Sequence, residues 1–315
     1  MIVDLKPGDK VISYFVLRKK EMRTKRESGE LYLSVELVDA SGRISGSYWD
    51  NVKKKYDALD HGDILKVKAT VIDFKNRKHL SIEKLRKALD RDDYDLSQLV
   101  PKVDKDIEQL LEKLDKLIVG VQDPHLGQLL KSVFDDPAVR KEFAQAPGGK
   151  LWHHNYIGGL LEHTLSVTEI AQTTGAMYPG VDLDLLVAAG LLHDIGKIAS
   201  YSYDTLIDFT DEGRLIGHIV IGSQMVAQRI QEIKGFPKEL QKRLIHLILS
   251  HQGKLEQASP VVPMTLEGLI LYYADELDSK ANAFLRIKKK EGHRRWSSYV
   301  NLMGQYFYFG SQEEE

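Results

Sequence analysis

Short apolar runs dominate the first 87 residues. Runs rich in Val, Ile, Leu and aromatic residues alternate with breaks such as Ser41-Gly42 and His61-Gly62-Asp63. This spacing predicts five strands, over residues 11–17, 31–38, 44–49, 64–72 and 79–85. The charged stretch 53–60 between the third and fourth runs is predicted to be a helix. Because five strands with a helix at that place follow the order of an OB-fold, residues 1–87 are predicted to form an all-β OB-fold barrel.

The apolar spacing becomes helical after Pro101, as in the run Ile107, Leu110, Leu111, Leu114, Leu117 and Ile118. Further helices are predicted after Pro124 and Pro137, and over residues 155–176, 182–192, 216–233, 238–250 and 265–290. The pattern predicts a multidomain chain, in which an all-β barrel precedes an all-α domain. The expected division is a barrel at 1–87, a helical linker region at 88–150, the all-α domain at 151–295 and a C-terminal tail at 296–315.

Composition narrows the class of protein. At 315 residues the chain exceeds the usual size of one hydrophobic core. It contains no apolar run near 18 residues and no secretory signal at its start, so we expect no membrane association and a cytoplasmic location. Cysteine is absent, which excludes disulfides, thiolate metal sites and cysteine nucleophiles.

Charge is unevenly distributed. The chain carries a net −2, but residues 1–90 hold 20 Lys and Arg against 14 Asp and Glu, so the remainder carries −8. A basic front and an acidic, histidine-containing back indicate one part that binds a polyanion and another that binds cations. Ordinary variation in surface charge is the alternative.

Histidines and aspartates recur along the predicted helices. Seven of the eleven histidines lie between residues 153 and 251. One such histidine on an apolar helix is more often a core residue than a ligand. The adjacent pair His193-Asp194 differs, because two polar side chains after the apolar run 185–192 are costly to bury without partners. Gly196 then permits a tight turn beside a cavity.

The candidate metal ligands are His163, His193, Asp194, His218, His251 and Asp275. Imidazole nitrogen and carboxylate oxygen suit Mn²⁺, Fe²⁺, Co²⁺, Ni²⁺ or Zn²⁺, and a set without thiolates argues against a purely structural zinc site. Six ligands are more than one ion with open positions requires. A bridging carboxylate and two ions explain the number and suit phosphoryl transfer.

Several neighbouring residues have two interpretations. His153 and His154 are candidate substrate contacts or helix-entry packing residues. Asp278, one turn after Asp275, either orients a ligand or is solvated. His246 is expected in the core and Glu162 on the surface.

The order of His163, His193-Asp194 and Asp275, with the strings EHT and HDIGK, resembles the HD superfamily of metal-dependent phosphohydrolases over about residues 155–285. The all-α domain is therefore identified as an HD domain. The resemblance implies that those four residues hold a first metal, and that Asp194 bridges to a second metal held by His218 and His251. It also implies a metal-activated hydroxide as nucleophile, with Asp194 and Lys197 as catalytic residues and Lys197 facing the substrate phosphate.

The barrel favours a nucleic acid as substrate. Its predicted first loop carries six candidate phosphate contacts, Arg18, Lys19, Lys20, Arg23, Lys25 and Arg26, and Tyr32 and Trp49 are candidate base contacts. Strand alternation places Tyr48 and Trp49 on opposite faces, so at most one of the two stacks on a base. A solubilising hairpin is the alternative for the basic loop.

Residues 1–310 resemble the YhaM-type family of Gram-positive bacterial 3′-to-5′ exoribonucleases, through GDKV, HHNYIGGLLEHTLSV, LLHDIGK and SHQG. The resemblance implies Mn²⁺- or Co²⁺-supported release of nucleoside monophosphates from the 3′ end of single-stranded RNA, with single-stranded DNA left open as a further substrate. The alternatives are a phosphohydrolase of free or cyclic nucleotides and a non-catalytic nucleic-acid-binding factor. A homo-oligomer is compatible with each of them, and the aromatic tail is expected to pack in the core or at an interface.

Overall fold

The computed structural model describes residues 1–150 and 153–310. The remaining residues, which include the start of the expected HD domain and the end of the expected tail, lie outside the described part of the chain. Two units are distinguished, Met1–Lys102 with Tyr203–Ile207, and Val103–Ser202 with the residues from Asp208 onward.

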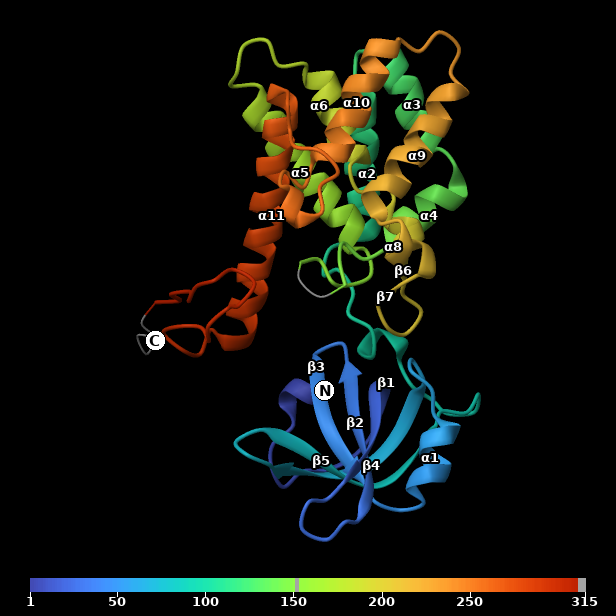
Figure 1. Ribbon diagram of the computed structural model, residues 1–315, viewed down its shortest axis with the longest axis vertical. Helices are drawn as coiled ribbons and strands as arrows, with labels where there is room; N and C mark the ends of the chain where they lie inside the picture. The colour runs from blue at the N-terminus through green and yellow to red at the C-terminus, as the bar shows by residue number, and fades with distance from the viewer. Residues whose placement is uncertain (151–152, 311–315) are drawn as a thin grey trace. The chain divides into compact units, whose positions relative to one another are not determined.

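The first unit is a closed five-stranded barrel (Figure 1). Its strands are β1 (Lys10–Thr24), β2 (Leu31–Asp39), β3 (Gly42–Tyr48), β4 (Ile64–Asp73) and β5 (Lys78–Lys87). Around the barrel the order is β1-β2-β3-β5-β4; β1 and β4 close it antiparallel, and β3 and β5 pair in parallel. Helix α1 (Val52–Ala58) joins β3 to β4, and 3₁₀ turns lie at Ile2–Asp4 and Leu96–Gln98. This is the strand order of an OB-fold, as the sequence predicted.

Strand β1 runs seven residues beyond its predicted end at Leu17. A bulge between Leu17 and Lys19 shifts the register, and the strand then pairs with β2 until Thr24 lies opposite Leu31. The predicted first loop is therefore mostly strand. Sequence patterning missed it because both faces of this ribbon are polar or half-exposed, and cross-strand pairing supplies what burial does not.

The second unit is built of helices, with a two-stranded sheet of β6 (Tyr201–Ser202) and β7 (Asp208–Phe209). The helices are α2 (Ile107–Gly120), α3 (Pro124–Phe134), α4 (Pro137–Gln145), α5 (Gly159–Gly175), α6 (Leu183–Leu192), α7 (Lys197–Ser200), α8 (Asp211–Leu215), α9 (His218–Gln231), α10 (Lys238–Ser250) and α11 (Leu266–Glu291), with a 3₁₀ turn at Leu255–Gln257. Aspartates begin α2, α3 and α4 by accepting hydrogen bonds from the first turn, and proline follows the cap in α3 and α4.

Helix α6 lies at the centre of this unit. Every residue from Leu185 to Leu192 is buried, as expected of a helix that is apolar on all sides. It packs on α5, α10 and α11, and it ends at Leu192, so His193 and Asp194 enter the interior directly. Across the described residues, no helix combines the length and apolarity that a bilayer crossing requires.

A glycine is needed at position 196 because two backbone segments pack closely there. The tight turn expected from the sequence does not explain it. Its φ of −64° is open to any residue. A Cβ atom at this position would lie 2.1 Å from the carbonyl oxygen of His218 and 2.4 Å from the nitrogen of Gly222. The hydrogen side chain therefore lets α9 approach the segment that follows Asp194.

We expect Gly196→Ala to lower the stability of the helical unit by about 1–3 kcal/mol, because two backbone segments would have to separate. Thermal unfolding followed by circular dichroism measures this. Gly120→Ala is the matched control, since no atom lies within 4 Å of its added Cβ; it should leave the midpoint unchanged or slightly higher. Equal midpoints for the two variants would contradict the packing argument.

Candidate metal centre

Six candidate ligands converge from five helices. His163 lies in α5, His193 and Asp194 directly follow α6, and His218 is the first residue of α9. His251 directly follows α10, and Asp275 lies in α11. His163, His193, Asp194 and His251 are fully buried, while the His218 and Asp275 side chains keep 19% and 15% of their surface exposed. The set is thus mostly enclosed by protein, with His218 and Asp275 partly exposed.

Asp194 occupies the middle of the set. Its Oδ2 atom lies 3.3 Å from Nε2 of His163 and 3.3 Å from Nε2 of His193. Its Oδ1 atom lies 3.4 Å from Nε2 of His218 and 3.5 Å from Nε2 of His251. Asp275 Oδ1 lies 3.1 Å from His163 Nε2. Each oxygen of one carboxylate therefore faces two imidazoles, and Asp275 joins the Oδ2 group.

Backbone carbonyls orient the rings of His193 and His251 through their other ring nitrogens. Nδ1 of His193 donates to the carbonyl oxygen of Gly190 at 2.8 Å, and Nδ1 of His251 donates to that of Ile248 at 2.7 Å. A carbonyl only accepts, so Nδ1 carries the proton and, in the neutral ring, Nε2 presents a lone pair. Both histidines sit one residue past a helix and bond back three residues, a local device that orients them toward Asp194.

The arrangement fits a divalent cation. Among the described residues, Nε2 of His163, His193 and His218 and Oδ1 of Asp194 are buried without a hydrogen-bond partner. Lone pairs that face carboxylate oxygens at 3.3–3.5 Å repel them unless positive charge lies between. The nitrogen and oxygen donor set suits first-row transition metals. The residues present therefore match the group that the sequence predicted.

The electrostatics favour the same conclusion. Burial would lower the pKa of His163, but contacts with Asp194, Asp275 and Asp278 outweigh it and raise that pKa well above its usual range. Burial would raise the pKa of Asp194, yet Lys197 and the histidines hold it well below its usual range. Burial lowers the pKa of His218 to about 3. The pocket thus combines ionised carboxylates with a neutral imidazole and stabilises added positive charge.

Lys197 lies against the ligands. Its Nζ atom donates to Asp194 Oδ2 and, at 2.6 Å, to the carbonyl oxygen of Gly148. Burial lowers the pKa of Lys197, but Asp194 outweighs this and raises it, so the ammonium is charged. Two of its three donors are used within the protein.

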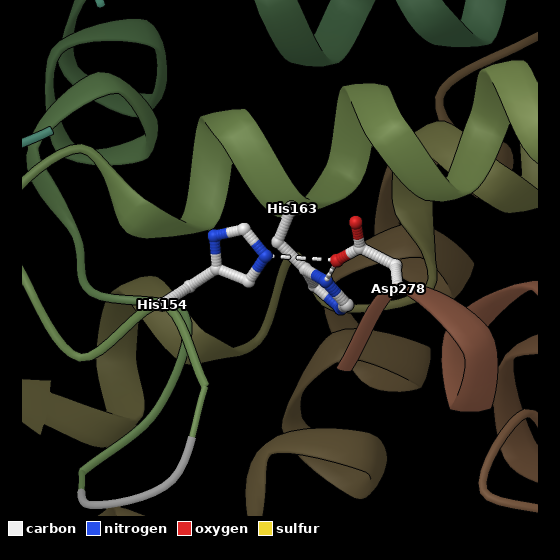
Figure 2. Close-up of side chains that lie close together, drawn as sticks. All are labelled: His154, His163 and Asp278. Carbon is white, nitrogen blue, oxygen red and sulfur yellow. Dashed lines mark hydrogen bonds and ion pairs between the residues drawn. The ribbon is translucent and has the colours of Figure 1, made fainter. Parts of the chain in front are cut away.

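Figure 2 shows a second layer, behind His163. Oδ2 of Asp278 accepts from Nδ1 of His163 at 2.7 Å and from Nε2 of His154 at 2.8 Å. The same three residues could themselves enclose an ion. Two donated protons already satisfy the aspartate oxygen, so we interpret the cluster as a support that fixes His163 with its Nε2 toward Asp194.

His154 is enclosed on its other side as well. Its Nδ1 atom lies 2.9 Å from the Tyr156 hydroxyl, which donates to Glu162 at 2.5 Å. Lys105 pairs with Glu162 at 2.8 Å, and together these partners lower the pKa of Glu162 to about 2 although burial would raise it. Glu162, expected on the surface, is a largely buried member of this layer. The sequence around Glu162 did not reveal this network, because Tyr156 and His154 contact Glu162 from the loop that precedes α5.

His153 and His154 occupy different environments. His154 is 2% exposed and has φ of +44°, and Gly159 approaches it so closely that a Cβ there would lie 2.1 Å from its carbonyl oxygen. Both ring nitrogens of His153 lack a partner among the described residues, and its ring centroid lies 5.2 Å from that of His163. Burial holds the pKa of His153 well below its usual range, so it is a neutral imidazole beside the centre. His246, expected in the core, is half-buried and accepts from the backbone of Met264.

The predicted nucleic-acid contacts belong to the barrel unit. Arg18, Lys19, Lys20 and Arg23 lie in β1. Arg18 pairs with Glu36, Lys19 and Arg23 pair with Glu21, and Lys20 donates to backbone carbonyls of α1 and the residue after it. Lys25 and Arg26 are exposed at the turn between β1 and β2, and no carboxylate of the described residues lies within ion-pair distance of either. The turn is thus the part of the basic segment that is open to a phosphate.

Tyr32 and Trp49 form a stacked pair on the barrel. Their ring centroids lie 4.7 Å apart with an interplanar angle of 27°. Trp49 is 39% exposed, whereas Tyr48 is buried in the barrel core. The alternation predicted for residues 48 and 49 is therefore confirmed, and Trp49 is the residue of the two that can meet a base.

We expect the wild-type chain to bind two divalent ions and Asp194→Ala to bind none, because both groups of imidazoles depend on its two oxygens. His218→Ala and His251→Ala should each bind one. Equilibrium dialysis against Mn²⁺ followed by elemental analysis gives the stoichiometry. The matched control is His246→Ala, because His246 lies in α10, the helix that His251 directly follows. This variant should bind two ions. One ion in the wild type would contradict the bridged arrangement.

The layer behind His163 should tune one of the two ions. We expect Asp278→Asn and His154→Ala each to weaken binding of one ion, the ion held by His163, by about 10–100-fold. Removal of groups that orient a ligand has that effect on metal affinity. Titration calorimetry with Mn²⁺ resolves the two events. In the His163→Ala background, neither substitution should change the remaining ion further; an equal loss at both ions would contradict the assignment.

Comparison with known proteins identifies the domain that holds these residues. The model of the HD domain matches residues 160–280. Similar solved structures include the HD domain of the Listeria monocytogenes phosphodiesterase PgpH, with 16% identity over 50% of this chain and 86% of that chain and a TM-score of 0.31. The second OB-fold domain of replication protein A from Methanococcus maripaludis has 18% identity over 30% of this chain and 97% of that chain, with a TM-score of 0.23. A chain of a replication protein A heterotrimer bound to single-stranded DNA has 17% identity over 29% of this chain and 65% of that chain, with a TM-score of 0.22.

These likenesses to solved structures are distant, and the assignment rests on the matched domain and the observed topology. Residues 160–280 are an HD domain, the domain of metal-dependent phosphohydrolases, and in this chain it follows a closed barrel with the strand order of an OB-fold.

Proposed function

We propose that the protein is a 3′-to-5′ exoribonuclease that hydrolyses single-stranded RNA, and also single-stranded DNA, to nucleoside monophosphates. The observation that carries the proposal is the position of Asp194, whose two oxygens each face two imidazole nitrogens. A carboxylate in this position can bridge two divalent ions, and paired ions are suited to in-line displacement at a phosphodiester.

The six side chains would hold the ions, His163, His193 and Asp275 on the Oδ2 side of Asp194, and His218 and His251 on its Oδ1 side. Such ions, when bound, generate a nucleophile from water and neutralise charge on the phosphate. The chain's own contribution is to keep the imidazoles oriented through their Nδ1 bonds. The third donor of Lys197 Nζ remains for a phosphate oxygen, and the unpartnered ring of His153 can donate to substrate.

The barrel supports a polymeric substrate. A stacked Tyr32–Trp49 pair with an exposed tryptophan offers a platform for bases, and the exposed Lys25 and Arg26 offer phosphate contacts. A phosphohydrolase of free nucleotides has no need of such a surface. The direction of degradation and the preference for Mn²⁺ or Co²⁺ rest on the resemblance to the YhaM-type family.

The test uses single-stranded RNA labelled at either end, with Mn²⁺ or with chelator. We expect 5′-labelled RNA to give a ladder that shortens stepwise and 3′-labelled RNA to release labelled mononucleotide at once, both only with metal. Mononucleotides and cyclic dinucleotides are incubated in parallel. Hydrolysis of these small molecules alone would overturn the exonuclease, and RNA binding without any turnover would favour a non-catalytic factor.

We further expect His193→Ala and Asp194→Ala to lower turnover more than about a thousandfold, since loss of a single stabilising group already costs roughly 10²–10³ in kcat. Their RNA affinity should stay within about twofold of wild type, because the bases and most phosphates are bound elsewhere. His246→Ala serves as the control and should retain activity. Turnover that survives in Asp194→Ala would remove the metal centre from the mechanism.

A further inference from the structure

The chain continues past α11 into a hairpin, here called the C-terminal hairpin, residues 295–309. In Figure 1 it is the red segment that doubles back beyond the end of α11. Trp296 pairs with Tyr308, and Val300 pairs with Gln305. Backbone hydrogen bonds from Ser297 to Phe307 and from Phe309 to Arg295, of 2.8 and 2.9 Å, hold its two arms together.

One face of the hairpin anchors it to the helix. Phe307 and Phe309 pack on Phe284 of α11, with ring centroids 5.0 and 5.8 Å from it. Tyr306 and Tyr308 alternate with these two residues and so point to the opposite face, as in a strand. They are 60% and 48% exposed. The aromatic run predicted to pack in the core or at an interface therefore packs only through its phenylalanines.

The opposite face presents four aromatic rings. Trp296 lies 4.9 Å from Tyr308, and Tyr299 lies 5.1 Å from Tyr306, measured between ring centroids. Trp296 and Tyr299 are 53% and 50% exposed. The hairpin thus packs on α11 through its phenylalanines, while the two aromatic pairs remain partly exposed.

The segment that carries this face is rich in positive charge. Residues 286–310 contain six Lys and Arg and one acidic residue, Glu291, in a chain whose net charge is −2. Lys288, Lys289, Lys290, Arg294 and Arg295 are all exposed. The Arg295 guanidinium lies 5.6 Å from the Tyr308 ring centroid. Lys289 faces Asp104 at 3.4 Å, but both side chains are more than 80% exposed, so this pair neutralises little.

Exposed rings in a segment with exposed cations match the chemistry of a single-stranded nucleic acid. Bases stack on aromatic faces regardless of sequence, while Lys and Arg bind phosphates and release counterions. A protein partner would favour an apolar centre depleted of charge, with few lysines. We propose that residues 286–310 form a second contact for the single strand, in addition to the barrel; that the strand is also the substrate rests on the proposed function.

The experiment measures binding in the full-length Asp194→Ala chain, which leaves the strand intact. A fluorescent 20-nucleotide single-stranded RNA is titrated by anisotropy at several salt concentrations. The basic variant combines Lys288→Gln, Lys289→Gln and Lys290→Gln. The matched control combines Lys116→Gln, Lys131→Gln and Lys141→Gln, which removes the same charge from exposed positions on α2, α3 and α4.

We expect the basic variant to lose about tenfold in affinity at low salt and to show a log–log salt slope smaller by about two, since each phosphate contact in a single strand contributes roughly 0.7. The control should stay within about twofold. Tyr306→Leu with Tyr308→Leu should lose roughly fivefold to a hundredfold with an unchanged slope, because stacking is lost and charge is not. Tyr306→Phe with Tyr308→Phe keeps the rings and should restore affinity.

Two results would overturn the proposal. One is unchanged affinity and slope in both the basic and the leucine variants. The other is a change in oligomeric state, measured by light scattering, with RNA affinity intact, which would make the hairpin a protein interface. Because binding is measured without turnover, failure of the wild-type chain to degrade RNA would refute the exonuclease and leave this contact standing.

Discussion

The buried carboxylate of Asp194 is the constraint on which the helical unit depends. An ionised carboxylate that is removed from water costs several kcal/mol unless its surroundings compensate it. Here Lys197 and imidazoles from α5, from the start of α9 and from the residues that follow α6 and α10 supply that compensation, so four helices must meet at one point. Because α6 is apolar on all sides it is buried, and Asp194, which follows it, is therefore buried too. Gly196 allows α9 to approach closely enough for His218 to face Asp194. Packing and chemistry in this unit therefore share one centre.

The centre is oriented by ordinary backbone groups. His193 and His251 each use the carbonyl three residues earlier, in the last turn of the helix they follow. His163, inside a helix, has no free carbonyl there and uses Asp278 instead. The difference explains why His163, unlike His193 and His251, is supported by a second layer of side chains, which extends through His154 to Glu162.

Much of this could be read from the sequence. Periodicity predicted most helices, and four of the five strands to within a few residues, since these elements have a regular apolar face. Asp194 was recognisable because it adjoins His193 after a fully apolar run. The end of β1, the short helices α7 and α8, and the partners of Glu162 could not be predicted, because they arise from contacts between distant segments. The same holds for Gly196, whose role appears only when α9 is in place.

Because the ligands come from five separate helices, a bound metal would also restrict the conformational freedom of the chain. An ion bound by both His163 and Asp275 closes a loop of about 110 residues, and such a closure removes conformational freedom from the opened chain. The ion would then act as a reversible cross-link that lowers the population of the opened chain, which is the form that proteases cleave. Supply of the metal would accordingly govern how long the protein persists in a cell as well as how fast it works.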